Sequence, residues 1–182
     1  MRQVFILIVL LVISAANGYS QDAGKAGKDP VDTLAPYQKY PTLPAFNVME
    51  MDSVTIFNTY NIPKGRPVAI MLFSPDCGHC ARMTDEILEK IDSLSGIDFY
   101  LVTPVHNMDD IRKFYEHHHH AEYSNVKMVG RDYEFFYGGY YKIAVVPDLA
   151  LYDAQKKLVK LFQGETRVHF IYEALEQAKG QK

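Results

Sequence analysis

Apolar and polar residues follow one another along this chain in a pattern that predicts alternating strands and helices. Residues 68–73 form a continuous apolar run, as expected for a strand buried on both faces. Apolar residues then recur at helical spacing over 83–94, and Ser95-Gly96 supplies a stop. Residues 97–103 predict another strand. This alternation implies a βαβ unit.

Shorter elements flank this unit. Short apolar runs predict further strands at 46–48, 54–57 and 126–129, the first two as short strands or a hairpin. Asn107 is suited to cap a helix that follows the second long strand. Residues 132–137 predict a short helix that ends at Gly138-Gly139.

The last part of the chain predicts a β-hairpin and a closing helix. Pro147 leads into 149–152, and a polar turn separates this strand from 158–162. Gly164 ends the hairpin, and Thr166 can cap a last helix with apolar residues on one face. The whole pattern therefore predicts an α/β fold.

The N-terminus has the three parts of a secretory signal: a charged start, an apolar run over 4–13 and small residues at 14–16. The run is shorter than the roughly 20 residues that span a bilayer. An uncleaved anchor or a buried core helix is the alternative. No cysteine near the cleavage point could accept a lipid. We predict a signal peptide at 1–18 and an exported protein, periplasmic or secreted.

Composition favours one folded domain behind a linker. Residues 19–40 are largely polar and without periodicity, which predicts a flexible linker, and 41–180 form the expected domain. With 182 residues, 48% of them hydrophobic, the chain can bury one good-sized core. The net charge of -3 provides no basic surface for a phosphate backbone, so we expect no nucleic-acid binding. We also expect a monomer.

The cysteine pattern favours redox chemistry. The chain has two cysteines, Cys77 and Cys80, which are separated by two residues. A disulfide that closes so small a loop constrains little of the unfolded chain, so a structural staple is a poor explanation. A zinc ribbon needs a second pair of ligands, and a covalent haem site needs a histidine where Ala81 stands.

The motif has the parts that thiol exchange needs. Cys77 lies at the predicted start of a helix, where unpaired amides and the helix dipole favour a thiolate. Cys80 follows one turn later on nearly the same face. We therefore predict that Cys77 is the nucleophile and Cys80 the resolving thiol. His79 can carry a positive charge that favours the thiolate further, so Gly78 and His79 are expected to tune the redox properties.

These residues resemble the thioredoxin superfamily, and more narrowly its exported TlpA-like and ResA-like thiol-disulfide oxidoreductases. The resemblance covers about residues 41–179 and is carried by Phe73-Ser74-Pro75-Asp76-Cys77-Gly78-His79-Cys80 and Val146-Pro147. It implies a thioredoxin-like fold with a central mixed β-sheet flanked by helices. The first two predicted strands would add an N-terminal β extension.

The resemblance also implies a substrate-binding role for Val146 and Pro147. In that family the proline that matches Pro147 is cis and lies beside the active cysteines, where the preceding backbone pairs with the substrate chain. An ordinary trans proline at the start of a strand is the alternative.

Two positions depart from thioredoxin itself. Thioredoxin has a buried acid on the strand before its motif, whereas Met71 stands here, so the proton acceptor for Cys80 is not identified. Gly78-His79 is the dipeptide of protein disulfide isomerases and differs from the Gly-Pro of thioredoxin. An imidazolium there stabilises the reduced form and makes the couple more oxidising.

Other polar clusters are expected to be structural. The run His117 to His120 invites a metal interpretation, but adjacent residues on a helix point around all its faces, so we expect a solvated helix end and no metal site. Aromatic residues over 133–141 are expected to pack in the core and at its rim. Asp85 and Glu86 are expected to form a solvated charged face.

The leading hypothesis is an exported enzyme that reduces protein disulfides. Its clients would be disulfide-containing proteins, its electron donor a membrane thiol reductase, and its redox group the Cys77-Cys80 disulfide, without another cofactor. A disulfide oxidase or isomerase with the same motif is one alternative, which His79 favours. A non-enzymatic metal-binding module or copper chaperone is the other.

Overall fold

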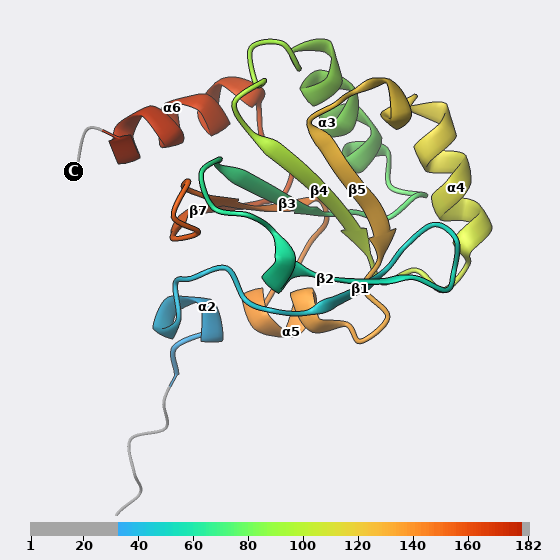
Figure 1. Cartoon of the computed structure of the whole chain (residues 1–182), viewed down its shortest axis with the longest axis horizontal. Coiled ribbons are helices and arrows are strands. Elements are labelled where there is room, and N and C mark those ends of the chain that lie inside the picture. Colours follow the sequence, from blue (N-terminus) through green and yellow to red (C-terminus); the bar gives the residue numbers. More distant parts are fainter. Residues whose placement is uncertain (1–32, 180–182) are drawn as a thin grey trace, which may run out of the picture. The chain divides into compact units, whose positions relative to one another are not determined.

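One mixed β-sheet organises the described part of the chain. The structure is a computed structural model that describes residues 33–179, so the predicted signal peptide and most of the predicted linker lie outside the described residues. Seven strands are ordered β2-β1-β5-β4-β3-β6-β7 (Figure 1). They are β1 (Asn47–Met49), β2 (Ile56–Asn58), β3 (Val68–Leu72), β4 (Asp98–Thr103), β5 (Val126–Arg131), β6 (Asp148–Tyr152) and β7 (Leu158–Gln163).

The middle of the sheet is parallel and its two sides are antiparallel. β3, β4 and β5 run in the same direction, whereas β6 and β7 on one side and β1 and β2 on the other pair antiparallel. All residues of β3 are buried, which confirms a strand covered on both faces. The predicted thioredoxin-like arrangement, with a mixed sheet and an N-terminal β extension, is confirmed.

Helices cover both faces of the sheet (Figure 1). On one face lie α3 (Gly78–Glu89), α4 (Met108–His117) and α6 (Val168–Lys179), and on the other lie α2 (Pro36–Lys39) and α5 (Phe136–Tyr141). Two short 3-10 helices, η1 (Thr59–Asn61) and η2 (His120–Glu122), complete the elements. Among residues 33–179, no helix is long and apolar enough to cross a membrane.

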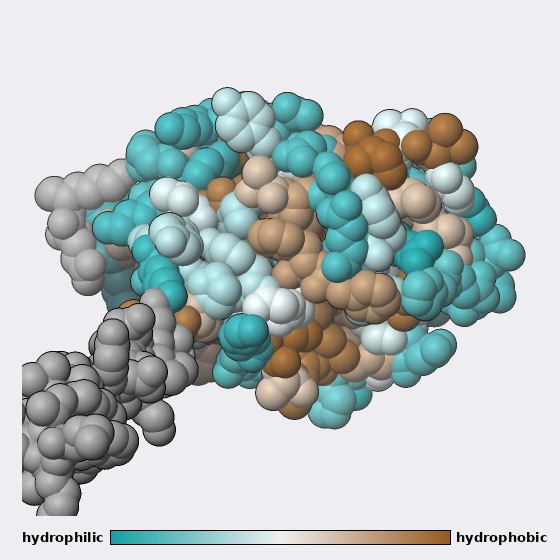
Figure 2. Space-filling view, turned by 90° about the horizontal axis from the view of Figure 1, so that it is seen from below, coloured by the Kyte–Doolittle hydropathy of each residue, from teal (hydrophilic) through white to brown (hydrophobic). Residues whose placement is uncertain are grey.

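The helices on the two faces of the sheet differ in length. α3 and α6 have 12 residues each, whereas α2 and α5 have 4 and 6. α2 lies within the segment that the sequence predicts to be a linker, and its Tyr37 ring packs on Tyr141 of α5. Figure 2 views the α5 and β1 side, where apolar residues gather in the middle of the face with polar residues beside them.

A glycine allows the N-terminal strands to join the sheet. β1 pairs with β5 through Met49 and Arg131. A Cβ on the neighbouring Gly130 would lie 2.6 Å from the Met49 carbonyl oxygen and 2.8 Å from a Val48 methyl carbon. Because real Cβ atoms do not approach a carbonyl oxygen so closely, only glycine permits this approach of the two backbones.

α5 differs from its prediction. The sequence predicts a helix over 132–137 that ends at two glycines, but the helix begins at Phe136 and contains both. The Asp132 carboxylate accepts the backbone N–H groups of Phe136 at 3.0 Å and Tyr137 at 2.8 Å, which fixes the start. Tyr137 and Tyr141 are then one turn apart and both fully buried. Their burial outweighs the poor helix propensity of glycine.

Two other helix ends differ from their predictions. α3 ends at Glu89, before the expected stop, and the chain continues in turns that still bury Leu94. α6 begins at Val168, whose N–H group lies 3.4 Å from the Glu86 carboxylate of α3. The sequence predicts that Thr166 caps this helix, but the first N–H group of α6 finds its partner in a side chain of α3.

Several hydrogen-bonded polar side chains are buried between α5 and the sheet. The Tyr137 hydroxyl lies 2.8 Å from Asp148 Oδ1, and the hydroxyls of Tyr141 and Tyr152 bond to each other. Asp148 is fully buried, and its Oδ2 has no hydrogen-bond partner among the described residues. Burial raises the pKa of Asp148 from 3.8 to about 6, although the bond from Tyr137 opposes this shift.

We predict that Asp148→Asn stabilises the protein at pH 7. The raised pKa means that the folded state binds a proton between about pH 4 and pH 6 that the unfolded state does not, so stability falls as pH rises through this window and stays lower above it. The amide mimics the protonated acid. The free energy of unfolding should rise by about 2 kcal/mol at pH 7 and little at pH 4.

Urea denaturation from pH 4 to pH 8 measures this difference. Asp92→Asn, which changes an exposed aspartate in the turns after α3, is the matched control and should leave the profile unchanged. Equal stability of Asp148→Asn and the parent at pH 7 would contradict the prediction.

Candidate active site

Cys77 lies where the chain turns from β3 into α3. Its N–H group donates to the Ser74 carbonyl oxygen at 3.1 Å, which closes the turn after the strand. As the N-cap residue of α3, Cys77 accepts the Cys80 N–H group on its Sγ at 3.2 Å. The sulfur therefore occupies the position of a capping oxygen, where unpaired amides and the helix dipole favour negative charge.

Cys80 is shielded behind Cys77. It is fully buried and packs in the core with Met71 and Phe73, whereas Cys77 is partly exposed. Burial first, and the hydrogen bond with Cys77 second, raise the pKa of Cys80 to about 12. Both cysteines are free thiols in this structure. Cys77 is thus partly exposed to solvent, and Cys80 is buried one helical turn further along.

The loop before β6 lies against Cys77. The Val146-Pro147 peptide bond is cis. The Cys77 thiol can donate a hydrogen bond to the Val146 carbonyl oxygen, which lies 3.8 Å from Cys77 Sγ. The Pro147 carbonyl oxygen accepts the Gly164 N–H group at 2.9 Å, and this glycine has φ +84°, a conformation that other residues rarely adopt. The structure thus brings Val146, Pro147 and Cys77 together.

His79, which lies between the two cysteines, contacts a pair of charged side chains, Arg82 and Glu165. His79 Nδ1 lies 2.5 Å from Glu165 Oε2, and Arg82 donates to both oxygens of Glu165, at 2.8 Å and 3.3 Å. The pKa of Glu165 is lowered to about 2 by these hydrogen bonds, of which that from Arg82 has the larger effect and that with His79 the smaller. His79 itself is largely exposed, with a side-chain accessibility of 67%.

The model of the thioredoxin-like domain family matches residues 60–179. This range covers more than half of the chain and includes both cysteines and Pro147. The chain belongs to the thioredoxin-like family. No curated protein sequence matches the chain significantly.

Solved structures with this fold include redox proteins. The thioredoxin domain of a thiol-disulfide oxidoreductase from Bacteroides vulgatus is similar with a TM-score of 0.59 and 18% identity, over 75% of this chain and 94% of that one. A secreted Mycobacterium tuberculosis disulfide oxidoreductase homologous to E. coli DsbE gives 0.55 and 12%, over 74% and 95%. Peroxidoxin BcpB of M. tuberculosis gives 0.60 and 10%, over 78% and 96%. At these identities the likeness shows the fold.

Within this thioredoxin-like fold, no acid faces Cys80 from the position of Met71. Met71 is fully buried in the same core cluster as Cys80. Asp148 pairs in register with Leu72, one residue further along β3, and packs against Tyr137 on the opposite face of the sheet. Because side chains alternate between the faces of a strand, Asp148 is not placed to take a proton from Cys80.

The histidine run is not the solvated helix end that the sequence predicts. His118 and His120 are buried, and only their neighbours remain exposed. α4 ends at His117 and His119 takes a left-handed conformation, so His118 and His120 both turn toward Phe114. Burial lowers the pKa of His118 and lowers that of His120 to about 4.

These buried histidines act as structural contacts in this structure. His118 Nδ1 lies 2.8 Å from the Asp85 carboxylate of α3, and His120 Nδ1 lies 3.1 Å from the Tyr115 carbonyl oxygen. Asp85 is therefore not part of a purely solvated face, as the sequence predicts, and Glu86 contacts Arg167 and Val168 of the α6 region. Within residues 33–179, no three histidine, cysteine or acidic side chains are grouped to hold a metal ion.

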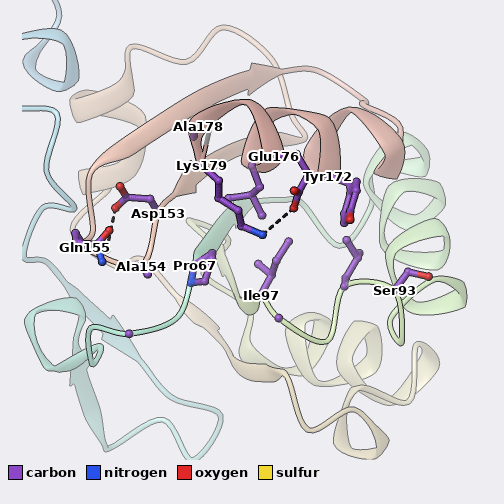
Figure 3. Close-up of a pocket in the computed structure, with 14 residues that line it drawn as sticks. Pro67, Ser93, Ile97, Asp153, Ala154, Gln155, Tyr172, Glu176, Ala178 and Lys179 are labelled. Atoms are coloured by element: carbon purple, nitrogen blue, oxygen red, sulfur yellow. Dashed lines mark hydrogen bonds and ion pairs between the residues drawn. The ribbon is translucent and has the colours of Figure 1, made fainter. Parts of the chain in front are cut away.

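Two hollows differ in their relation to the cysteines. One lies beside the motif, lined by Pro75 and Asp76 before α3, Ala81 of α3, Phe114 of α4 and His118 just after α4. Another, of about 330 Å³, lies between α6 and the edge of the sheet where β3 begins (Figure 3). β3 ends at Leu72, just before the cysteine motif, so this second hollow is at the opposite edge of the sheet from Cys77.

Sequence reasoning missed Glu165 and Arg82. Glu165 is 86 residues from His79, and nothing in its neighbourhood marks it as part of the site. The signal that could have found it is topological. In the predicted fold, the residues after the last strand lie beside the loop that contains Pro147, and hence beside the cysteines.

We predict that iodoacetamide modifies Cys77 faster than Cys80 at pH 6. Cys77 is partly exposed at a helix start, whereas Cys80 is fully buried and has a pKa raised to about 12. Timed labelling of the reduced protein, followed by mass spectrometry of its peptides, measures both rates. The urea-unfolded protein is the control, in which the two rates should converge. Faster labelling of Cys80 in the folded protein would reverse the assigned roles.

Proposed function

We propose that this protein is an exported thiol-disulfide oxidoreductase that reduces disulfides of other proteins through Cys77 and Cys80. The observation that supports it best is the pairing of a partly exposed cysteine at the start of α3 with a fully buried cysteine one turn later. This asymmetry gives one sulfur access to a client and protects the other until the first has reacted.

In the first step, the Cys77 thiolate attacks one sulfur of a client disulfide. A bond forms between Cys77 Sγ and that sulfur, the client disulfide breaks, and the second client sulfur leaves as a thiolate that takes a proton from water. The Cys80 N–H group, which donates to Cys77 Sγ at 3.2 Å, and the start of α3 favour negative charge on the attacking sulfur.

In the second step, Cys80 attacks Cys77 Sγ in the mixed disulfide. The Cys77-Cys80 disulfide forms, and the first client sulfur leaves and is protonated, so two electrons and two protons reach the client in all. Because the pKa of Cys80 is about 12, its proton must pass to water or to the departing client sulfur as the bond forms. Met71 offers no acceptor.

The loop with Val146 and Pro147 is proposed to hold the client. Its backbone lies against Cys77 Sγ, so an extended client segment that pairs with it would present its disulfide to this sulfur. Pairing through main-chain groups tolerates varied client sequences.

The direction of electron flow distinguishes the leading proposal from its alternative. The dipeptide Gly78-His79 favours a disulfide oxidase or isomerase, because positive charge near Cys77 stabilises the reduced form. The carboxylate of Glu165 beside His79 counteracts this charge and supports a reductant. We further propose a monomer without another cofactor, in the periplasm or secreted, whose dithiol a membrane thiol reductase restores.

We predict different outcomes for the two cysteine variants. Cys77→Ser should abolish reduction of insulin, since it removes the attacking sulfur. Cys80→Ser should accumulate a mixed disulfide with the client, because it keeps the attacking group and lacks the resolving one. Insulin turbidity measures turnover, and non-reducing electrophoresis detects the mixed disulfide. Turnover by both variants would rule out thiol exchange through this pair.

Equilibration of the Cys77/Cys80 couple with glutathione tests the direction. A potential near or below that of a reducing thioredoxin, about -270 mV, supports the reductant, and a value near -120 mV supports an oxidase. Copper titration of the reduced protein tests the remaining alternative, a metal-binding module. Stoichiometric copper binding without insulin reduction would favour it.

A further inference from the structure

Glu165 is held beside the cysteine motif by the end of the hairpin. It follows Gly164, whose N–H group donates to the Pro147 carbonyl oxygen at 2.9 Å. One backbone hydrogen bond therefore joins the loop that faces Cys77 to the residue directly before Glu165. The Glu165 side chain has an accessibility of 31%, about half that of either side chain it contacts, His79 and Arg82.

The carboxylate is shared by a histidine and an arginine. Arg82 makes a two-point contact with Glu165, in which Nη2 donates to Oε2 at 2.8 Å and Nε donates to Oε1 at 3.3 Å. His79 Nδ1 lies 2.5 Å from Oε2 and 2.6 Å from Arg82 Nη2. Nδ1 can donate to Glu165 only when it carries a proton, and it can accept from Arg82 only when it does not, so each tautomer of His79 satisfies one of these two contacts. In either tautomer the imidazole lies against the pair formed by Arg82 and Glu165.

Arg82 brings a permanent charge close to Cys77. A Cβ placed on Gly78, the residue after Cys77, would lie 3.7 Å from Arg82 Nη1, so the guanidinium lies over the first residue of α3. The pKa of Arg82 is raised, first by its bond to Glu165 and further by the charge of the Cys77 thiolate. An arginine in this place stabilises the thiolate unless an opposite charge compensates it.

With an uncharged imidazole, Arg82 and Glu165 together carry no net charge. Removing the carboxylate would leave one positive charge beside Cys77, and removing the guanidinium would leave one negative charge. Stabilising the thiolate stabilises the reduced form and makes the couple more oxidising.

We propose that Glu165 is a positioning residue that holds Arg82 and His79 at the start of α3 and cancels the charge of Arg82, and thereby keeps the Cys77/Cys80 couple reducing. This inference rests on the proposed function, because it concerns the same thiol pair. It adds a residue from the far end of the hairpin to the control of the potential.

The test is the equilibrium constant of the couple with glutathione at pH 8, where free imidazole is uncharged. Glu165→Gln should shift this constant about three- to tenfold toward the dithiol, which corresponds to a rise of about 15 to 30 mV. Arg82→Gln should shift it in the opposite direction. The double variant Arg82→Gln/Glu165→Gln should return close to the parent, because it removes both charges.

Salt and a remote variant separate charge from structure. The shift caused by Glu165→Gln should shrink between 0.05 M and 1 M NaCl, since these groups are exposed enough to be screened. Glu176→Gln, which breaks the somewhat more exposed pair with Lys179 at the opposite edge of the sheet, is the control and should leave the potential unchanged.

The outcomes distinguish this inference from the proposed function. Shifts of the same sign in both single variants, an unchanged potential in Glu165→Gln, or a double variant far from the parent would overturn the role of Glu165 while the couple still titrates. A parent protein whose Cys77/Cys80 pair never equilibrates with glutathione would instead overturn the proposed function itself.

Discussion

The antiparallel register of β3 and β6 is the constraint on which the site depends. Leu72, the last residue of β3, pairs with Asp148, the first of β6. The end of one strand therefore lies beside the beginning of the other, and the residues just outside them, Cys77 and the Val146-Pro147 pair, face each other. A shift of one residue would move every side chain of β6 to the other face and separate the loop from the sulfur.

α3 links the surrounding elements to the cysteine motif through three contacts that each involve a charged side chain of this helix. Arg82 contacts Glu165 after β7, Asp85 contacts His118 after α4, and Glu86 contacts Arg167 just before α6. Each pair is exposed on at least one side, so each contributes little to stability by itself. Together they define where α3 lies, and with it the position of Cys77 at the helix start. The same helix therefore supplies the reactive thiols and the contacts that orient them.

Local patterns were sufficient for the strands, for the order of the elements and for the place of Cys77 and Cys80 at the start of α3. A run as apolar as 68–73 can be stable only when covered on both faces, and the spacing of the cysteines at the predicted start of a helix restricts their geometry. Local patterns failed where a distant group changed the balance. The glycines at 138 and 139 lie inside α5 because Tyr137 and Tyr141 are buried against the sheet.

The sequence by itself determined the α/β class, the motif at the strand-to-helix junction and the proline before the hairpin, because each depends on neighbours within a few residues. Only the tertiary structure decided that Glu165 lies beside His79, that His118 is buried against Asp85, and that Asp148 faces away from Cys80. These contacts join residues that are up to 86 positions apart. No periodicity along the chain encodes them, since they follow from how the sheet orders its strands and which face each side chain takes.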